Sequence, residues 1–287
     1  EYYHRLSRAA AMSSLGLGPW SPQTLRLPPS RGLTHRGLAS EVPQRRLDKP
    51  SSFGASAVTA LTGIVTTIRR WQAPRRATQN VRSLAPLPQM EGKPHESLVH
   101  FSEMANWLAP GHLMVGRYPM LQKSKDACQR HLQRLVREAE ISTFVCVQSE
   151  VPSQEDLRLW PAGGIDVKGR RCLPYAKMAQ QASPRKLEFL HQPLDDLEIP
   201  GSENLMSFTR ELEVRAQQGE KIFVHCMGGR GRSNLVAGCV LARLYNLNAD
   251  EVENRLQYGY DARNYDNCLV PETQRQRETL RAFVERL

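Results

Sequence analysis

Residues 221–233 read KIFVHCMGGRGRS: an apolar run leads into a His-Cys pair, three glycines, two arginines and a serine. The run 221–225 has the composition of a buried strand, and a helix is expected over 232–245, so only a short loop separates the two. Glycines let such a loop fold tightly with its N–H groups pointing inward. A ring of amides at a helix N-terminus binds anions, and the guanidinium fork of Arg232 matches phosphate oxygens. The stretch therefore predicts a phosphate-binding loop.

Cys226 ends the strand and lies at the base of this loop. Helix termini and backbone amides stabilise thiolates, which are strong nucleophiles. We therefore expect Cys226 to be a catalytic nucleophile. The residues expected around the phosphate are His225, Met227, Gly228, Gly229, Arg230, Gly231 and Arg232.

Other phosphate loops do not fit the stretch. A Walker A loop needs Gly-Lys followed by Ser or Thr, and a dinucleotide-binding fingerprint needs a third glycine where this chain has Asn234. The remaining alternative is a buried cysteine that ends a strand before a glycine turn. It explains neither Arg232 nor the helix that begins there.

Outward from the loop, short apolar segments alternate with amphipathic ones. This alternation predicts an α/β fold with a central, mostly parallel sheet flanked by helices. We expect Asn248 and Glu251 to form a capping box at the start of the helix that follows 232–245. We expect Pro271 in the first turn of the last helix. Strands are expected over 112–116, 141–147, 186–192 and 221–225, and helices over 124–138, 202–218 and 232–245.

The charge of the chain is unevenly distributed. Residues 1–90 contain 13 Lys+Arg and 3 Asp+Glu, whereas residues 91–287 contain 26 of each. The net charge of +10 therefore belongs to the first part, which argues against a nucleic-acid-binding globular domain. We expect a presequence-like basic arm over 1–50, an uncharged helical segment with a Pro/Arg-rich linker over 51–94, and a globular domain over 95–287.

The basic arm has the composition of an organellar presequence. No acidic residue occurs from Tyr2 to Ser40, and five arginines do. We expect a mitochondrial location, with a plastid as the alternative, and a processing region at 34–40. A disordered basic tail is the other interpretation of the arm. If residues 1–90 are ordered, a large organellar assembly with protein, lipid or RNA surfaces is their expected partner.

The segment 50–68 is uncharged, and its apolar residues recur at helical spacing. It predicts an amphipathic helix, with contact to a membrane surface through residues 53–68. A membrane-spanning helix is the weaker alternative, because serine, threonine and glycine interrupt the apolar run.

The six cysteines are scattered without a C-x-x-C pair. In a chain long enough to bury a core, this spacing predicts reduced thiols in an intracellular compartment. It predicts neither a disulfide framework nor a metal site.

The segment HCMGGRGRS, residues 225–233, resembles the His-Cys-x5-Arg-Ser/Thr signature of the cysteine-dependent protein tyrosine and dual-specificity phosphatase superfamily. The similarity extends over about residues 107–287, and 106–119 looks like the first strand of the small members. Asn234 departs from the pattern, since a small Gly or Ala is common at that position, and this puts the packing of the loop in question. The resemblance implies a phosphatase-like domain that needs no metal or cofactor.

The resemblance also implies roles for individual residues. Cys226 would form the phosphocysteine, and Arg232 would bind the phosphate. Ser233 would ease departure of the thiolate. In HQPLDDLEIP, residues 191–200, Asp196 would be the general acid, with Asp195 as the alternative. Gln276 would place the hydrolytic water, or it is an exposed helix residue.

Two neighbours of the cysteine are read by comparison with the same family. His225 would order the loop. Arg230 would recognise an acidic lipid or a multiply phosphorylated peptide, unless it is a solvated loop arginine. The expected substrates are phosphorylated proteins or phospholipids.

Two functions are therefore open from the sequence. One is an active organellar phosphatase. The other is a phosphatase-fold accessory subunit of a large mitochondrial assembly, anchored by its arm, with catalysis idle or secondary.

Overall fold

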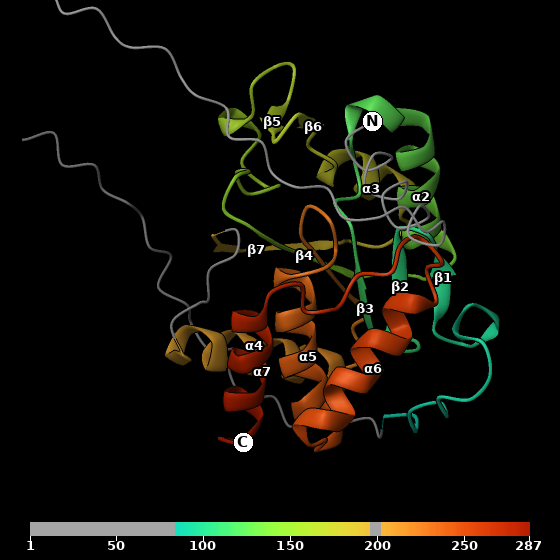
Figure 1. Ribbon diagram of the computed structural model, residues 1–287. Coiled ribbons are helices and arrows are strands. Elements are labelled where there is room, and N and C mark those ends of the chain that lie inside the picture. The colour runs from blue at the N-terminus through green and yellow to red at the C-terminus, as the bar shows by residue number, and fades with distance from the viewer. Residues whose placement is uncertain (1–83, 196–201) are drawn as a thin grey trace, which may run out of the picture. The chain divides into compact units, whose positions relative to one another are not determined.

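The structure is a computed structural model that describes residues 84–195 and 202–287 (Figure 1). The expectations for residues 1–83, including the presequence, the segment 50–68 and its membrane contact, lie outside these ranges. So does Asp196. Among the described helices, none has the length and apolar character that crossing a membrane requires.

A six-stranded sheet forms the centre of the domain (Figure 1). Its order is β1-β2-β3-β8-β4-β7, and β3, β8, β4 and β7 run parallel, whereas β1 and β2 are antiparallel additions at one edge. A mostly parallel sheet is therefore confirmed. The strands are β1 His100–Ser102, β2 Ala105–Ala109, β3 Leu113–Gly116, β4 Thr143–Gln148, β7 Glu188–Leu194 and β8 Ile222–His225.

Helices cover both faces of this sheet. Alternate strand residues point to opposite sides, so that Val224 contributes to one core and Phe223 to the other. The first core is closed by α4 Ser202–Gln217, α5 Arg232–Tyr245, α6 Ala249–Asp261 and α7 Gln274–Val284, and the second by α2 Lys125–Arg137 and α3 Ala176–Ala182. Three short 3-10 helices occupy Pro94–Glu96, Gln122–Ser124 and Leu157–Leu159.

Helix α5 lies at the centre of the first core. All side chains from Arg232 to Ala242 are buried. A Cβ placed on Gly238 would lie 3.0 Å from Leu256 and 3.1 Å from Leu280, so the glycine lets α6 and α7 approach closely. The helix that carries the signature arginine and serine is thus buried over its first eleven residues.

One local prediction needs correction. Pro271 is not in the first turn of the last helix, because α7 begins at Gln274 with Thr273 as its N-cap and a capping box to Gln276. Between β4 and β7 the structure also contains a two-stranded antiparallel hairpin that was not predicted, β5 Ile165–Val167 and β6 Arg170–Cys172. The capping box of Asn248 and Glu251 is confirmed.

The ordered fold extends before His95. Leu87 packs against the first core, the one closed by α4, α5, α6 and α7. Tyr245 Oη donates to the carbonyl of Ala85 at 3.1 Å, Arg255 to that of Pro88 at 3.1 Å, and Tyr258 Oη to that of Glu91 at 2.9 Å. Residues 84–91 thus form a strap over α5 and α6.

A chain that begins at residue 95 is expected to be less stable than one that begins at residue 84, by about 1–3 kcal/mol, because it loses the Leu87 contact and these hydrogen bonds. Thermal unfolding of the two chains tests this, since about 1 kcal/mol shifts the midpoint by ~2–4 °C in a domain of this size. Equal midpoints would show that the strap contributes nothing.

His131 makes the fold sensitive to acid. Its ring is buried beside Phe101, and its Nε2 has no hydrogen-bond partner among the described residues. Burial, together with Arg134, Arg263 and Arg117, lowers the pKa of His131 from 6.5 to about 3. Between pH 6.5 and 3 only the unfolded chain therefore gains this proton, and the free energy of unfolding falls as the pH falls.

In a His131→Leu variant, the loss of stability between pH 6.5 and 4 is expected to be shallower by about 1.4 kcal/mol per pH unit. Urea unfolding at several pH values measures the slope. The exposed His95, changed to Gln, is the control. An unchanged slope in His131→Leu would show that His131 does not set the acid sensitivity.

Candidate active site

The signature loop joins β8 to α5 at the carboxyl ends of the parallel strands. Cys226 lies at its base with 4% of its surface exposed, and its Sγ is 3.3 Å from Ser233 Oγ. The next residues, Met227 and Gly228, are half-buried, and the carbonyl of Met227 accepts from the N–H of Tyr118 at 3.2 Å. The structure thus brings the predicted nucleophile and the predicted serine into hydrogen-bond distance.

A buried arginine, Arg263, supports the loop from behind. Gly229 has φ +67°, and an added Cβ would lie 2.5 Å from the carbonyl carbon of Gly116. The guanidinium of Arg263 donates to the carbonyls of Gly229 at 3.0 Å and Val115 at 3.1 Å, and to Asn106 Oδ1 at 2.7 Å. Burial lowers the pKa of Arg263 to about 10, so the side chain stays charged at neutral pH. No pattern in the sequence pointed to Arg263.

Asn234 binds the loop from inside. Its Nδ2 donates to the carbonyl of Gly229 at 2.8 Å and to that of Arg230 at 3.0 Å. Glycine or alanine could make neither bond. The departure from the family pattern therefore adds two hydrogen bonds to the loop.

Gln276 is buried beside the loop, so the alternative of an exposed helix residue is wrong. A Cβ placed on Gly231 would lie 2.7 Å from Gln276 Oε1. The same oxygen accepts from the N–H of Thr273 at 3.2 Å, within the capping box of α7. A glycine at position 231 thus leaves room for this amide next to the loop.

Arg232 is held by a carboxylate that the sequence did not point to. Its Nη1 and Nη2 donate to the two oxygens of Glu150 at 2.6 and 2.9 Å, and Nη1 also donates to the carbonyl of Leu194 at 2.9 Å. This bidentate geometry fixes the plane of the guanidinium. Glu150 follows β4 by two residues, so its position past the carboxyl end of a parallel strand is the signal that could have found it.

Replacing Glu150 by Gln is expected to lower kcat/KM for an aryl phosphate by about 10- to 100-fold, because the buried guanidinium loses one of the two charge-assisted bonds that join it to Glu150. Steady-state kinetics measure the effect. Glu155→Gln, an exposed carboxylate of the same segment, is the matched control. An increase in kcat/KM would instead mean that Glu150 competes with phosphate for Arg232.

His225 is enclosed by aromatic side chains. Its Nε2 lies 2.6 Å from Tyr175 Oη, and the N–H of Tyr175 donates to Gln154 Oε1 at 2.8 Å. Burial, with a smaller contribution from His191, lowers the pKa of His225 to about 3. A ring that is neutral at pH 7 and bonded to a buried hydroxyl is suited to ordering the loop. It is not suited to proton transfer near neutral pH.

The candidate acid segment starts beside the arginine. β7 ends at Leu194, whose carbonyl accepts from Arg232, and the exposed Asp195 follows directly. Asp196 as the general acid stays a prediction.

Arg230 is not a solvated loop arginine, and that alternative is wrong. Its Nε donates to Tyr260 Oη at 3.0 Å, its Nη2 pairs with Asp266, and Glu272 lies 4.0 Å from its Nη1. The hydroxyl of Tyr260 in turn donates to Asp266 at 2.6 Å. The guanidinium is thus bound by residues of α6 and the segment that follows it.

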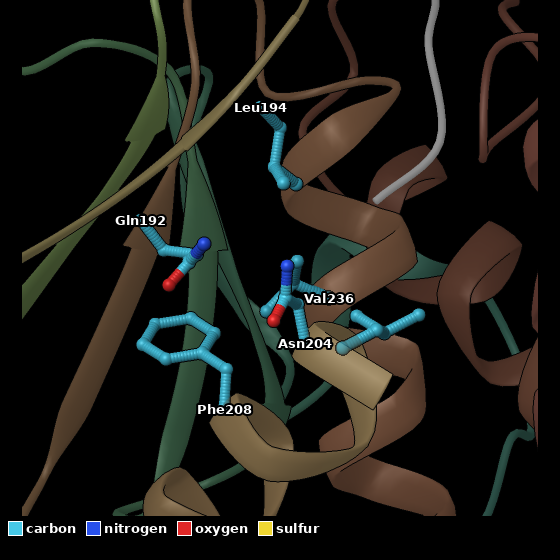
Figure 2. Close-up of a pocket in the computed structure, with 6 residues that line it drawn as sticks. Gln192, Leu194, Asn204, Phe208 and Val236 are labelled. Atoms are coloured by element: carbon cyan, nitrogen blue, oxygen red, sulfur yellow. The ribbon is translucent and has the colours of Figure 1, made fainter. Parts of the chain in front are cut away.

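A narrow crevice, too tight to hold a water molecule, lies next to the site between β7, α4 and α5 (Figure 2). It is lined by Gln192, Leu194, Asn204, Leu205, Phe208 and Val236. Its walls are mostly apolar and hold no ionisable side chain, so no chemistry is assigned to it.

The chain is similar to several known phosphatases and to one protein of unassigned function. A family model described as a polymorphic toxin system DSP-PTPase phosphatase matches residues 165–245. The uncharacterized protein MJECL20 of Methanocaldococcus jannaschii is 31% identical over 103 residues, which are 36% of this chain and 64% of the relative. Cyclin-dependent kinase inhibitor 3 of Sus scrofa is 41% identical over 54 residues, which are 19% of this chain and 26% of the relative.

The chain therefore spans less than two thirds of the length of these curated relatives. Among solved structures, Tk-PTP in the active form gives a TM-score of 0.43 at 24% identity, and the match covers 64% of this chain and 98% of that one.

The segment that the family model matches contains the whole signature loop and runs to the end of α5. Within it, the loop leads into α5, whose first two residues are Arg232 and Ser233, and the Ser233 hydroxyl lies 3.3 Å from the Cys226 Sγ. Over residues 165–245, which include the signature loop, the chain is therefore similar to the DSP-PTPase phosphatases that this family model describes.

Proposed function

We propose that the protein is a phosphomonoester hydrolase that acts through a phosphocysteine intermediate. The observation that carries the proposal is the position of the Cys226 Sγ at the base of the loop, 3.3 Å from Ser233 Oγ, with Arg232 fixed by Glu150. A nucleophile, a hydroxyl and a cation on one glycine-rich loop that ends at a helix N-terminus suit attack on a phosphate dianion.

In the first step, the loop amides and Arg232 bind the phosphate, and the Cys226 thiolate attacks phosphorus. The S–P bond forms as the P–O bond to the leaving group breaks. Asp196 gives its proton to the departing oxygen. The products of this step are a free alcohol or phenol and phosphorylated Cys226.

In the second step, water attacks the phosphocysteine. Asp196, now a carboxylate, accepts a proton from the water, the S–P bond breaks, and inorganic phosphate leaves. The Ser233 hydroxyl stabilises the departing thiolate, and Gln276, buried beside Gly231, places the water.

The proposed substrates are phosphoproteins, on Tyr or Ser/Thr, or phospholipids. The proposed location is the mitochondrion, with the plastid as the alternative. The support is the composition of residues 2–40, which include five arginines and no acidic residue.

A second candidate function is that of an accessory subunit, in which residues 1–90 anchor a phosphatase-fold domain to a large mitochondrial assembly. The net charge of +10 in this part of the chain favours it, because a basic arm binds acidic protein, lipid or RNA surfaces. A complex that survives purification only with the arm present would support this candidate. Native protein that is isolated as a free monomer with its arm already cleaved would contradict it.

Hydrolysis of p-nitrophenyl phosphate, followed by acid quenching and mass spectrometry of the Cys226 peptide, tests the main proposal. We expect phosphate release in the presence of EDTA and a phosphorylated Cys226 peptide in the quenched sample. A folded protein that releases no phosphate from this compound or from a phosphoinositide panel would overturn the hydrolase proposal and favour the accessory subunit.

A further inference from the structure

Arg230 and three residues beyond it form a compact charged cluster, named here the Arg230 latch: Arg230, Tyr260, Asp266 and Glu272. Three of them close a ring, because Arg230 donates to Tyr260 and Asp266, and Tyr260 donates to Asp266 at 2.6 Å. All three side chains are at least partly buried. The guanidinium is thus held by two hydrogen bonds and has its charge opposed.

The pairing of Arg230 matters for substrate binding, because Arg230 lies in the signature loop, two residues before Arg232. An unpaired guanidinium there could reach a second phosphate group next to the one being hydrolysed, and charge-assisted bonds to phosphate are strong. The latch turns the guanidinium toward α6 and the segment after it instead.

The surface beyond the latch carries two carboxylates. A hollow of about 300 Å³, open to solvent, is lined by Asp261, Asn264, Tyr265, Asp266 and Asn267. Asp266 is paired with Arg230, and the guanidinium of Arg117 lies 4.7 Å from the centre of the Tyr265 ring. A second phosphate on this side would therefore meet the carboxylate of Asp261 and an arginine that Asp266 already holds.

We propose that Asp266 is a specificity-determining residue that, by holding Arg230 in the latch, makes the site discriminate against substrates with a second phosphate close to the one hydrolysed. The inference rests on the proposed phosphatase activity and narrows its substrate class to isolated phosphomonoesters. It is the opposite of the expectation that Arg230 recognises multiply phosphorylated ligands.

Two synthetic peptides of one sequence provide the test, one with phosphotyrosine alone and one with an additional phosphothreonine two residues earlier. The readout is the ratio of kcat/KM for the doubly and the singly phosphorylated peptide, measured with the full chain. We expect a ratio at or below about 1 for the unaltered protein. In Asp266→Asn the ratio should rise about fivefold or more, since the freed guanidinium gains a charge-assisted bond.

Two further variants isolate the role of the latch. Asp261→Asn removes a carboxylate from the same hollow, but its partner is Gln257 and not Arg230, so its ratio should stay within about twofold of the unaltered protein. The double variant Arg230→Met, Asp266→Asn should return to the original ratio. A gain that persists in the double variant would overturn the inference, because it could not come from Arg230.

If Asp266→Asn does not fold, the single variant Arg230→Met tests the inference. We expect its ratio to equal that of the unaltered protein, because the latch has already withdrawn the guanidinium from the substrate. A fall in the ratio would show that Arg230 binds the second phosphate and would overturn the inference. So would an unchanged ratio in folded, active Asp266→Asn.

Failure of the proposed function gives a different result. In that case no variant releases phosphate from either peptide. The ratio of the dissociation constants for the two peptides is then measured by calorimetry. The proteins compared are the Cys226→Ser chains that do and do not carry Asp266→Asn. A binding ratio that Asp266→Asn does not change would overturn the inference for the inactive chain as well.

Discussion

Replacing Cys226 by serine is expected to lower kcat/KM for p-nitrophenyl phosphate by at least about 10⁴-fold, because a serine hydroxyl in this loop has no base to ionise it and cannot replace a thiolate. The phosphocysteine signal in quenched samples should disappear with the activity. Steady-state phosphate release, with protein folding checked by circular dichroism, measures the effect.

Cys128→Ser is the matched control. Cys128 is also buried, but it lies in α2, which packs on the other face of the sheet, with Ser124 Oγ 3.2 Å from its Sγ. Its activity should stay within about twofold of the unaltered protein. If Cys226→Ser kept a substantial share of the activity, the nucleophile would have to be another group and the proposed cycle would be wrong.

Asp196→Asn should lower kcat by about 10²–10⁴-fold, because the asparagine amide cannot give a proton to the leaving oxygen. The loss should be larger for phosphoserine peptides than for aryl phosphates, since an alkoxide is a poorer leaving group than a phenoxide. Kinetics on both substrate types measure this dependence.

Asp195→Asn distinguishes the two candidate acids. Asp195 is exposed and directly follows β7, and its substitution is expected to change kcat by less than about threefold. If Asp195→Asn lost the activity and Asp196→Asn kept it, the two assignments would be exchanged. Equal, small effects of both would place the general acid elsewhere.

The parts of the fold that depend on local signals could be predicted from the sequence. The bounds of α5 coincide with the prediction of a helix over 232–245, because a glycine loop precedes it and Asn246, in the left-handed region, ends it. The capping box at Asn248 was predictable for the same reason, since its two hydrogen bonds join residues three apart.

The contacts that build the site around the loop join distant residues, and these could not be predicted. Arg232 and Glu150 are 82 positions apart, His225 and Tyr175 are 50 apart, and Arg263 lies 34 positions after Gly229. No periodicity or spacing connects such pairs, because the sheet order that brings them together emerges only when the whole domain packs. The short β5–β6 hairpin was missed since three-residue strands hold too little periodic pattern.

The burial of α5 from Arg232 to Ala242 allows variants that lose their chemistry to be distinguished from variants that lose their fold. Amide protons buried in the middle of such a helix exchange with solvent chiefly when the whole domain opens. Exchange rates at Val236 and Val240 therefore report the global free energy of unfolding, and any variant that loses activity while these rates hold has been damaged only in its chemistry. One hydrogen-exchange experiment on α5 would thus sort every substitution described above into those that alter catalysis and those that unfold the domain.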